Sequence, residues 1–340
     1  MAIKSFICGV AGTALLPEER EFLAKEQPYG VILFARNVES PAQVSALTAD
    51  IKTLLTHPYA EILVDQEGGR VQRLKPPHWR KYPPALELAK RTDAARAIYI
   101  NARLIAEELR DVGITMDCAP VADVLAPECH AIIGNRAFGD NATDVARFAR
   151  EQSNGLLDGG ILSILKHIPG HGRAVVDSHE TLPIVSAPLA ELEAQDFAAF
   201  KALNDLPLAM TAHILYPALD GKDCATFSPI VIDYIRQEIG FSGLIMSDDL
   251  SMKALGGSFA ERTERSLAAG CDLVLHGNGA LIGEPVRDLM REIREVAAAA
   301  TPMNEASLKR AQAAASQRRT PKPAEEAALL AEWQQLLAAA

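Results

Sequence analysis

Short apolar runs alternate with longer amphipathic segments along most of the chain, a pattern typical of strands that alternate with helices. The predicted strands are Ile3–Gly9, Val31–Phe34, Ile62–Asp65, Ile114–Asp117, Leu162–Lys166, Leu208–Thr211, Leu244–Ser247 and Asp272–Leu275. The predicted helices are Glu18–Lys25, Ala42–Leu55, Asp93–Val112, Ala142–Asp158, Leu189–Leu203, Pro229–Ile239, Phe259–Ala269 and Pro285–Ala299.

Eight strand-plus-helix units predict an α/β protein with a parallel sheet. They favour a single (β/α)8 barrel of the TIM type over the competing arrangement, a doubly wound open sheet. A chain of 340 residues is long enough for such a barrel. We expect residues 1–300 to form it.

The composition shifts towards alanine from about Pro302 onward, with a break at residues 318–321. The last segment, Ala324–Ala340, is helical in pattern and has an apolar face formed by Leu329, Leu330, Trp333, Leu336 and Leu337. We expect residues 301–340 to be a C-terminal helical extension packed on the barrel or on a neighbouring subunit, not a separate domain.

Polar residues sit at or just past the ends of six predicted strands, namely Asp65, Asp117, Lys166 with His167, His213, Asp248 and His276. In a parallel barrel the carboxyl ends of the strands share one rim, where the loops converge into a pocket. Any one of these residues could merely cap a helix. Six such positions around one rim predict a single active-site opening.

The composition is that of an ordinary globular protein, with 49% apolar and 23% charged residues. The formal net charge of −10 has no compensating basic cluster, so a nucleic acid would be repelled. No apolar run approaches the roughly 20 residues of a membrane span. We therefore expect a small-molecule substrate, no nucleic acid and no membrane partner, and a monomer or weak homo-oligomer.

The five cysteines are scattered and form no C-x-x-C pair, which argues against a zinc knuckle or a disulfide framework. The apolar run from Phe6 to Leu16 resembles a short signal sequence. It contains two glycines and leads directly into a helix start, so a first strand and loop explain it better. We expect a cytoplasmic protein.

The segment richest in chemical groups starts with Lys166 and His167 and continues through His171. A proline and a glycine separate the two histidines, which argues against the i, i+4 pair of a zinc-binding helix. Residues 169–183 are predicted to form a long loop, and loops of this length are usually functional or disordered. A solvated loop whose polar residues satisfy one another is the alternative.

Asp177 and His179 lie two residues apart on this loop and could form a carboxylate–imidazole pair. Such a carboxylate orients the ring, fixes its tautomer and favours the imidazolium form. A histidine with a pKa near neutrality can donate a proton and later take it back. An isolated Asp-x-His is frequent by chance, and its place on a loop over the rim gives it weight.

Asp248 and Asp249 end the buried run that begins at Leu244. Asp248 would project towards the pocket and Asp249 could cap the next segment, although capping is an alternative for both. A carboxylate at this place suits attack on the anomeric carbon of a sugar.

A third candidate segment, residues 65–73, reads Asp-Gln-Glu-Gly-Gly-Arg-Val-Gln-Arg. Its paired glycines permit a tight turn, and arginines such as Arg73 offer forked donors for hydroxyls or carboxylates. The pattern fits sugar binding, phosphate binding or an internal salt-bridge network, and Arg136 is similarly ambiguous.

The motifs DQEGGRVQR, KHIPGHG, DSH and SDDLSM occur in this order on the expected strands. Together they resemble glycoside hydrolase family 3, and within it the single-domain bacterial β-N-acetylglucosaminidases of peptidoglycan recycling. The resemblance spans the barrel from the first strand to the eighth. The second motif usually has phenylalanine at the place of Ile168, which exchanges one apolar residue for another.

The resemblance implies a retaining exo-β-N-acetylglucosaminidase that needs no metal and no cofactor, acting on N-acetylglucosaminyl-1,6-anhydromuramoyl peptides in cell-wall recycling. It implies that Asp248 forms the covalent glycosyl-enzyme, that His179 is the acid/base and that Asp177 is the partner of His179. The residues that it implies for binding the terminal sugar are Asp65, Arg73, Arg136, Lys166 and His167. We hypothesise that loop closure delivers His179 only when substrate is bound, which structures with and without sugar would test.

Four alternatives compete with this interpretation. Metal-dependent barrel hydrolases commonly carry a His-x-His after the first strand, where residues 8–11 offer no ligand pair; sensitivity to EDTA would reveal one. A Schiff-base lyase using Lys166 would be trapped by borohydride. A non-catalytic sugar-binding protein would not need Asp248, and a phosphorylase would use phosphate instead of water. We expect His171 to be a structural hydrogen-bonding residue and His213 and His276 to be rim contacts.

Overall fold

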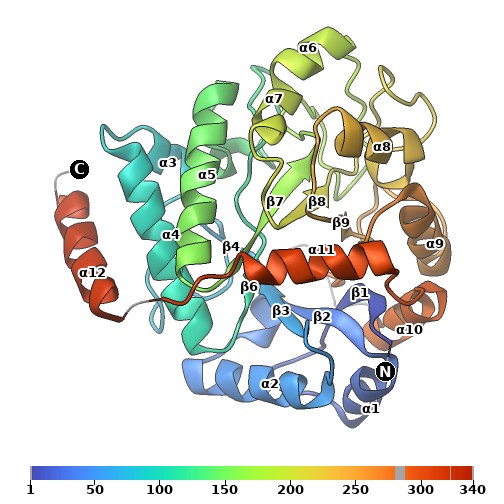
Figure 1. The fold of residues 1–340 in the computed structure, drawn as a ribbon, viewed down its shortest axis with the longest axis horizontal. Coiled ribbons are helices and arrows are strands. Elements are labelled where there is room, and N and C mark those ends of the chain that lie inside the picture. The colour runs from blue at the N-terminus through green and yellow to red at the C-terminus, as the bar shows by residue number, and fades with distance from the viewer. Residues whose placement is uncertain (1, 280–287, 322, 339–340) are drawn as a thin grey trace.

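The computed structural model describes residues 2–279, 288–321 and 323–338. Eight parallel strands close into a barrel in the order β1-β10-β9-β8-β7-β6-β3-β2 (Figure 1). These strands are β1 (Lys4–Gly9), β2 (Pro28–Leu33), β3 (Glu61–Val64), β6 (Met116–Asp117), β7 (Leu162–Ile168), β8 (Leu208–Thr211), β9 (Leu244–Asp249) and β10 (Leu273–His276). Each predicted strand corresponds to one of them, so the predicted barrel is confirmed.

Helices surround the barrel and connect its strands. They are α1 (Pro17–Glu26), α2 (Pro41–Leu54), α3 (Ala85–Ala89), α4 (Ala94–Asp111), α5 (Ala142–Asp158), α6 (Leu189–Ala194), α7 (Asp196–Lys201), α8 (Pro229–Gln237), α9 (Phe259–Ala269) and α10 (Leu289–Ala299). Side chains of the sequence fix several of their starts. At α9, for example, the Ser258 hydroxyl accepts from the Glu261 amide and the Glu261 carboxylate accepts from the Ser258 amide.

A single helix over Leu189–Leu203 is wrong, because the chain leaves helical geometry at Gln195 and forms α6 and α7 instead. The break leaves the Asp196 carboxylate buried against Arg173, with an Asp196 Oδ2 to Arg173 Nε distance of 2.6 Å. The predicted start of α10 at Pro285 lies outside the described residues.

The period-two alternation of the strands divides the apolar side chains into two layers. On β1, Ile7 points into the barrel interior, whereas Phe6 and Cys8 pack against the surrounding helices. On β9, Leu244 and Met246 likewise belong to the interior cluster. The same alternation decides which polar residues at the strand ends point inward.

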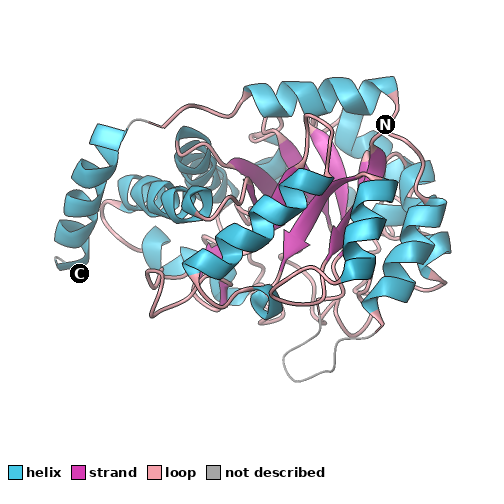
Figure 2. Cartoon of the chain, turned by 90° about the horizontal axis from the view of Figure 1, so that it is seen from below, coloured by secondary structure: helices cyan, strands magenta, loops and turns pink. Residues whose placement is uncertain are grey.

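Two further helices follow the barrel, α11 (Glu305–Ser316) and α12 (Pro323–Ala338). Helix α11 lies across the amino-terminal ends of the strands (Figures 1 and 2). There its Ser307 hydroxyl donates to Asp272, just before β10, and Ala311 and Ala314 join the interior cluster. Helix α12 packs against α4 through buried Trp333. Because α11 covers one end of the barrel, the carboxyl ends of the strands form the accessible end.

A short antiparallel hairpin, β4 (Gln66–Gly68) and β5 (Val71–Gln72), follows β3 at that accessible end. Within the described ranges, no helix combines the length and the apolar character that crossing a bilayer requires.

Candidate active site

A cavity of about 540 Å³ opens at the carboxyl ends of the barrel strands, a volume within the range of small-molecule sites. Seven of the eight predicted site residues line it, namely Asp65, Arg73, Arg136, Lys166, His167, His179 and Asp248. The eighth, Asp177, contacts His179. The structure therefore brings the predicted residues together, and their roles stay predictions.

Strand alternation explains why Lys166 and Asp248 reach the cavity. Lys166 has the same parity on β7 as Ile164, and Asp248 has the same parity on β9 as Met246, both of which lie in the barrel interior. Polar side chains at the ends of these inward rows therefore form the floor of the cavity.

His213 and His276 do not line the cavity, so their prediction as rim contacts is wrong. His276 has the outward parity of β10, and its Nε2 lies 3.0 Å from Glu292 Oε2 on α10. His213 is fully buried beneath the floor, where its Nδ1 lies 2.7 Å from Thr226 Oγ1. Both rings pack between the barrel and its surroundings instead of facing a ligand.

Asp117 also has the outward parity and lies outside the cavity lining, although we expected it at the rim. Its Oδ1 atom accepts a hydrogen bond from the Gln66 amide at 2.9 Å, so it supports the hairpin from below. Complete burial, helped by the nearby charges of Asp65 and Glu67, raises the pKa of Asp117 to about 7.

A network of buried charges forms one wall of the cavity. The Lys166 ammonium lies 3.0 Å from Asp65 and 2.6 Å from Glu67, with only 2% of its side chain exposed. Arg73 donates to the other Asp65 oxygen at 2.9 Å, and Arg136 binds both Glu67 oxygens at 2.8 Å. Every charge in the network has a partner of opposite sign, as burial requires.

Glu67 is the member of this network that we did not single out from the sequence. Burial acts to raise its pKa, but the charges of Arg136 and Lys166 outweigh that effect and lower the pKa to about 2. The same attraction to Glu67 and Asp65 raises the pKa of Lys166 despite burial. Lys166 is therefore protonated at neutral pH, which argues against the Schiff-base lyase.

The turn of the β4–β5 hairpin positions several residues of this charge network. Gly68 and Gly69 have φ values of 95° and 58°, a conformation that favours glycine. The side-chain oxygen of Gln66 accepts from the amides of Arg73 and Leu74, which closes the turn. The paired glycines thus allow one short segment to place Asp65, Glu67 and Arg73 around the same cavity wall.

Asp123 is a second residue that the sequence did not single out. It is completely buried, and its Oδ2 accepts from His167 Nδ1 at 2.7 Å. Its Oδ1 accepts from the amides of His167 and His171. Asp123 therefore fixes the ring of His167 and the start of the following loop. His171, as expected, is a buried hydrogen-bonding residue, and its Nε2 lies 3.1 Å from Ser178 Oγ.

The groups around Asp248 favour the ionised form of its carboxylate. Burial acts to raise its pKa, but His167, His213 and the Asp249 amide together lower it, with a further contribution from His179. Its neighbour Asp249 accepts from the amides of Ser251, Gly277 and Gly279, so Asp249 is held by the loops.

The loop between β7 and α6 carries Asp177 and His179. His179 Nδ1 donates to Asp177 Oδ1 at 2.8 Å, and the His179 amide donates to the same oxygen. Burial acts to raise the pKa of Asp177, but these contacts lower it. The His179 side chain is 34% exposed, so the other ring nitrogen can be reached from the cavity and from solvent.

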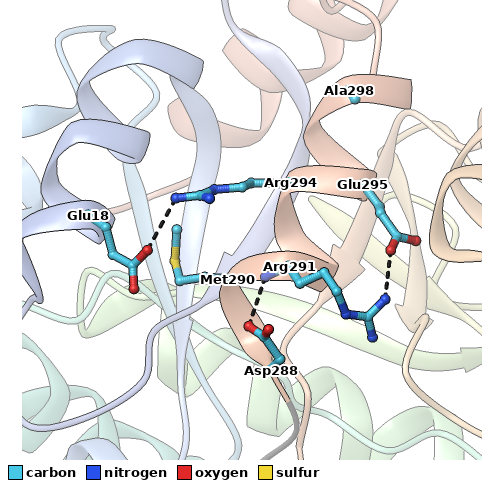
Figure 3. A pocket seen from close by; sticks show the side chains of 7 residues that line it. All are labelled: Glu18, Asp288, Met290, Arg291, Arg294, Glu295 and Ala298. Carbon is cyan, nitrogen blue, oxygen red and sulfur yellow. Dashed lines mark hydrogen bonds and ion pairs between the residues drawn. The ribbon is translucent and has the colours of Figure 1, made fainter.

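A second hollow of about 580 Å³ lies on the surface between α1 and α10 (Figure 3). Its charged side chains pair with one another: Arg294 with Glu18, and Arg291 with Glu295. All four are about one third or more exposed, and no strand end contributes to the lining. This hollow has none of the convergent polar groups of the barrel cavity.

Over the described part of the chain, no group of three or more His, Cys, Asp or Glu side chains could hold a metal ion.

A parallel barrel with an ionised carboxylate, a carboxylate–histidine pair and a charged cavity at its carboxyl end is the architecture of a barrel glycoside hydrolase. The chain matches the family described as "Glycosyl hydrolase family 3 N terminal domain" over residues 9–315. It therefore belongs to glycosyl hydrolase family 3, which confirms the resemblance carried by the four motifs.

Relatives and solved structures agree with this assignment. The chain is 42% identical to a Neisseria meningitidis "Beta-hexosaminidase" over 83% of this chain and 80% of the relative, and 39% identical to one from Nitrosomonas eutropha over 81% of each. The structure is similar to that of NagZ from Neisseria gonorrhoeae in complex with N-trifluoroacetyl-D-glucosamine. The TM-score is 0.84 at 34% identity, covering 97% of this chain and 94% of that one.

A β-N-acetylglucosaminidase of the same family from a Paenibacillus species gives a TM-score of 0.82 at 29% identity. That match covers 96% of this chain and 66% of that one.

Proposed function

We propose that this family 3 enzyme is a retaining exo-β-N-acetylglucosaminidase. In the proposed first step, Asp248 attacks the anomeric carbon while His179 protonates the departing oxygen, which yields a glycosyl ester. In the second step His179 takes a proton from water, the water oxygen attacks the anomeric carbon, and the carboxylate of Asp248 is released. Two displacements retain the anomeric configuration.

The observation that carries this proposal is that the Asp248 carboxylate and the His179 ring line the same cavity. Asp248 is favoured as nucleophile because its pKa is lowered despite burial, so it is ionised without a separate base. His179 is favoured as acid/base because Asp177 binds its Nδ1, which leaves Nε2 to exchange the proton. A neutral imidazole in the second step also adds no negative charge beside the ester.

The paired cations and carboxylates of the cavity wall suit a neutral sugar with many hydroxyls. We propose that the terminal sugar is bound by Asp65, Arg73, Arg136, Lys166 and His167. In the network Asp65 is shared by Lys166 and Arg73, so its position and charge are fixed before a ligand arrives. Groups held in this way lose little freedom on binding.

The choice of N-acetylglucosamine rests on the relatives named "Beta-hexosaminidase" and on the NagZ complex with N-trifluoroacetyl-D-glucosamine. The finer substrate, an N-acetylglucosaminyl-1,6-anhydromuramoyl peptide of cell-wall recycling, and a cytoplasmic location rest on the motif resemblance.

A panel of aryl β-glycosides tests the proposal. The wild-type enzyme should hydrolyse the N-acetylglucosaminide with retention, and Asp248→Asn should abolish turnover. Asp233→Asn, at an exposed position on α8, is the matched control and should behave as wild type. Full activity of Asp248→Asn, or hydrolysis of other glycosides in preference to the N-acetylglucosaminide, would contradict the proposal.

A further inference from the structure

The loop that carries Asp177 and His179 packs against a neighbouring loop. We refer to residues 169–188, between β7 and α6, as the β7 loop, and to residues 124–133, which follow β6, as the β6 loop. The two loops leave the barrel side by side because β6 and β7 are paired strands. The contacts between them therefore bear on where the acid/base pair lies.

Two backbone hydrogen bonds join the β6 loop to the β7 loop. The Ala126 amide donates to the Gly172 carbonyl at 3.0 Å. The His130 amide donates to the Ala174 carbonyl at 2.7 Å. Ala174 lies shortly before Asp177, whose carbonyl starts the turn of the acid/base pair. The β6 loop thus holds the β7 loop directly before that pair.

Gly172 allows the backbones of the two loops to touch. A Cβ atom at this position would lie 1.8 Å from the carbonyl oxygen of Val124 and 2.5 Å from its carbonyl carbon. Both are backbone atoms, so a larger residue would force the two loops apart. This contact gives a physical reason for the last glycine of the motif KHIPGHG.

Arg70, on the turn of the β4–β5 hairpin, fixes the far end of the β6 loop. Its Nη2 atom donates to the carbonyl of Ala131 at 2.6 Å, and also to the carbonyls of Ile132 and Ile133. These bonds all come from one nitrogen and reach neutral acceptors. Hydrogen bonds from a charged donor are stronger than those between neutral groups. A single cationic donor at this place therefore holds the end of the β6 loop.

The carbonyls that Arg70 holds adjoin the amide that holds the β7 loop. His130, which donates to Ala174, directly precedes Ala131 in the chain. The Nδ1 atom of His130 also accepts from the Ile132 amide at 3.1 Å, which closes the segment into a tight turn. Arg70 is therefore connected to the β7 loop through one short turn of backbone.

The position of His179 depends on these supports. Beyond Ala174 the side chain of Val175 is 55% exposed, and on the other side the Ala254 amide donates to the Ser178 carbonyl at 3.3 Å. A general acid must lie within hydrogen-bonding reach of the atom that it protonates. A misplacement of about 1 Å can slow a reaction about a hundredfold.

We propose that Arg70 is a positioning residue for proton transfer. It holds the β6 loop, and the β6 loop holds the β7 loop where His179 can reach the departing oxygen. This inference rests on the proposed function, in which His179 is the acid/base. It assigns to Arg70 a role in protonating the leaving group and none in binding the terminal sugar.

The test compares phenyl and 2,4-dinitrophenyl β-N-acetylglucosaminides, which have a poor and a good leaving group. For Arg70→Met, kcat/KM for the phenyl substrate should fall about tenfold, because that leaving group needs the proton. The value for the dinitrophenyl substrate should change less than about twofold, because that leaving group departs without one. His179→Ala is the reference and should show the same pattern more strongly.

Arg70→Lys tests whether one donor is sufficient. Because Arg70 uses a single nitrogen, the lysine ammonium should donate to the same carbonyls and recover most of the activity on the phenyl substrate. A loss as large as that of Arg70→Met would overturn the proposal. Arg147→Met, at a position on α5 where 54% of the side chain is exposed, is the control and should leave both values unchanged.

Gly172→Ala perturbs the same contact from the β7 side. It should cause the same selective loss on the phenyl substrate, because the added methyl group displaces the β7 loop from Val124. Gly221→Ala is the matched control, since a Cβ atom there meets nothing within 4 Å, and it should behave as wild type.

The outcomes separate this proposal from the proposed function. Equal losses on both substrates for Arg70→Met would overturn the positioning role, since Arg136 also donates to the Ile132 carbonyl and the wall for the terminal sugar would then be what Arg70 supports. A selective loss for His179→Ala with none for Arg70→Met would also overturn it, while the acid role stands. Equal losses on both substrates for His179→Ala would refute the acid role itself.

Discussion

Replacing Glu67 by glutamine removes the anion that joins two buried cations of the cavity wall. Glu67 binds Arg136 through both oxygens at 2.8 Å and Lys166 at 2.6 Å, and its side chain is 5% exposed. Burial acts to raise the pKa of Glu67, but the two cations lower it from 4.5 to about 2. That lowering corresponds to about 3 kcal/mol of stabilisation of the folded protein at neutral pH.

We therefore expect Glu67→Gln to reduce the free energy of unfolding by about 3 kcal/mol at pH 7, at the lower end of the cost of breaking a buried ion pair. The folded-state pKa is depressed, so the contribution is fully present above the unfolded pKa of about 4.5 and is lost as the pH falls towards 2. The difference in the free energy of unfolding between wild type and variant should stay constant from pH 7 to 5 and become smaller below pH 5. Urea denaturation at a series of pH values measures it.

Glu305→Gln is the control for this experiment. It removes an exposed carboxylate on α11, whose pair with Lys309 leaves both side chains more than 70% exposed. Such pairs contribute little to stability, so this variant should unfold as wild type does. The reasoning would be refuted if Glu67→Gln matched wild type at pH 7, or if its loss were as large at pH 3 as at pH 7.

Three further predictions concern the reaction. Asp123→Asn deprives His167 of its anionic partner, so the pKa of Asp248 should rise and the acid limb of kcat/KM should move to higher pH; an unmoved limb would show that Asp123 has only a structural role. His179→Ala should slow substrates with poor leaving groups about a hundredfold or more and those with good leaving groups much less, and equal losses would exclude the acid role. Asp177→Asn should show the same selectivity in weaker form, measured on the same two substrates.

The barrel could be predicted from the sequence because each strand is a short apolar run followed by a helical pattern. The prediction of a common rim was right for Asp65, Lys166, His167 and Asp248 but wrong for Asp117, His213 and His276. The period of two along each strand separates inward-facing Asp65, Lys166 and Asp248 from Asp117 and His276. It does not account for His167, which lines the cavity directly after Lys166, where the register of β7 is irregular.

Glu67 and Asp123 were missed for a different reason. Glu67 lies in a conspicuous motif, but the sequence does not say which of its polar residues faces the ligand and which lies behind. Asp123 lies after the two-residue strand β6 and reaches His167 on the neighbouring strand β7, a contact between residues 44 positions apart in the sequence. Contacts of this kind depend on how the closed barrel brings separate loops together, which local pattern does not reveal.

The proposed mechanism requires that a carboxylate oxygen of Asp248 forms the covalent bond to the anomeric carbon. A fluorinated N-acetylglucosaminyl fluoride slows breakdown of the ester, so the intact enzyme should gain the mass of one sugar and peptide mapping should place it on Asp248. A label on another side chain, or hydrolysis without any covalent adduct, would contradict it.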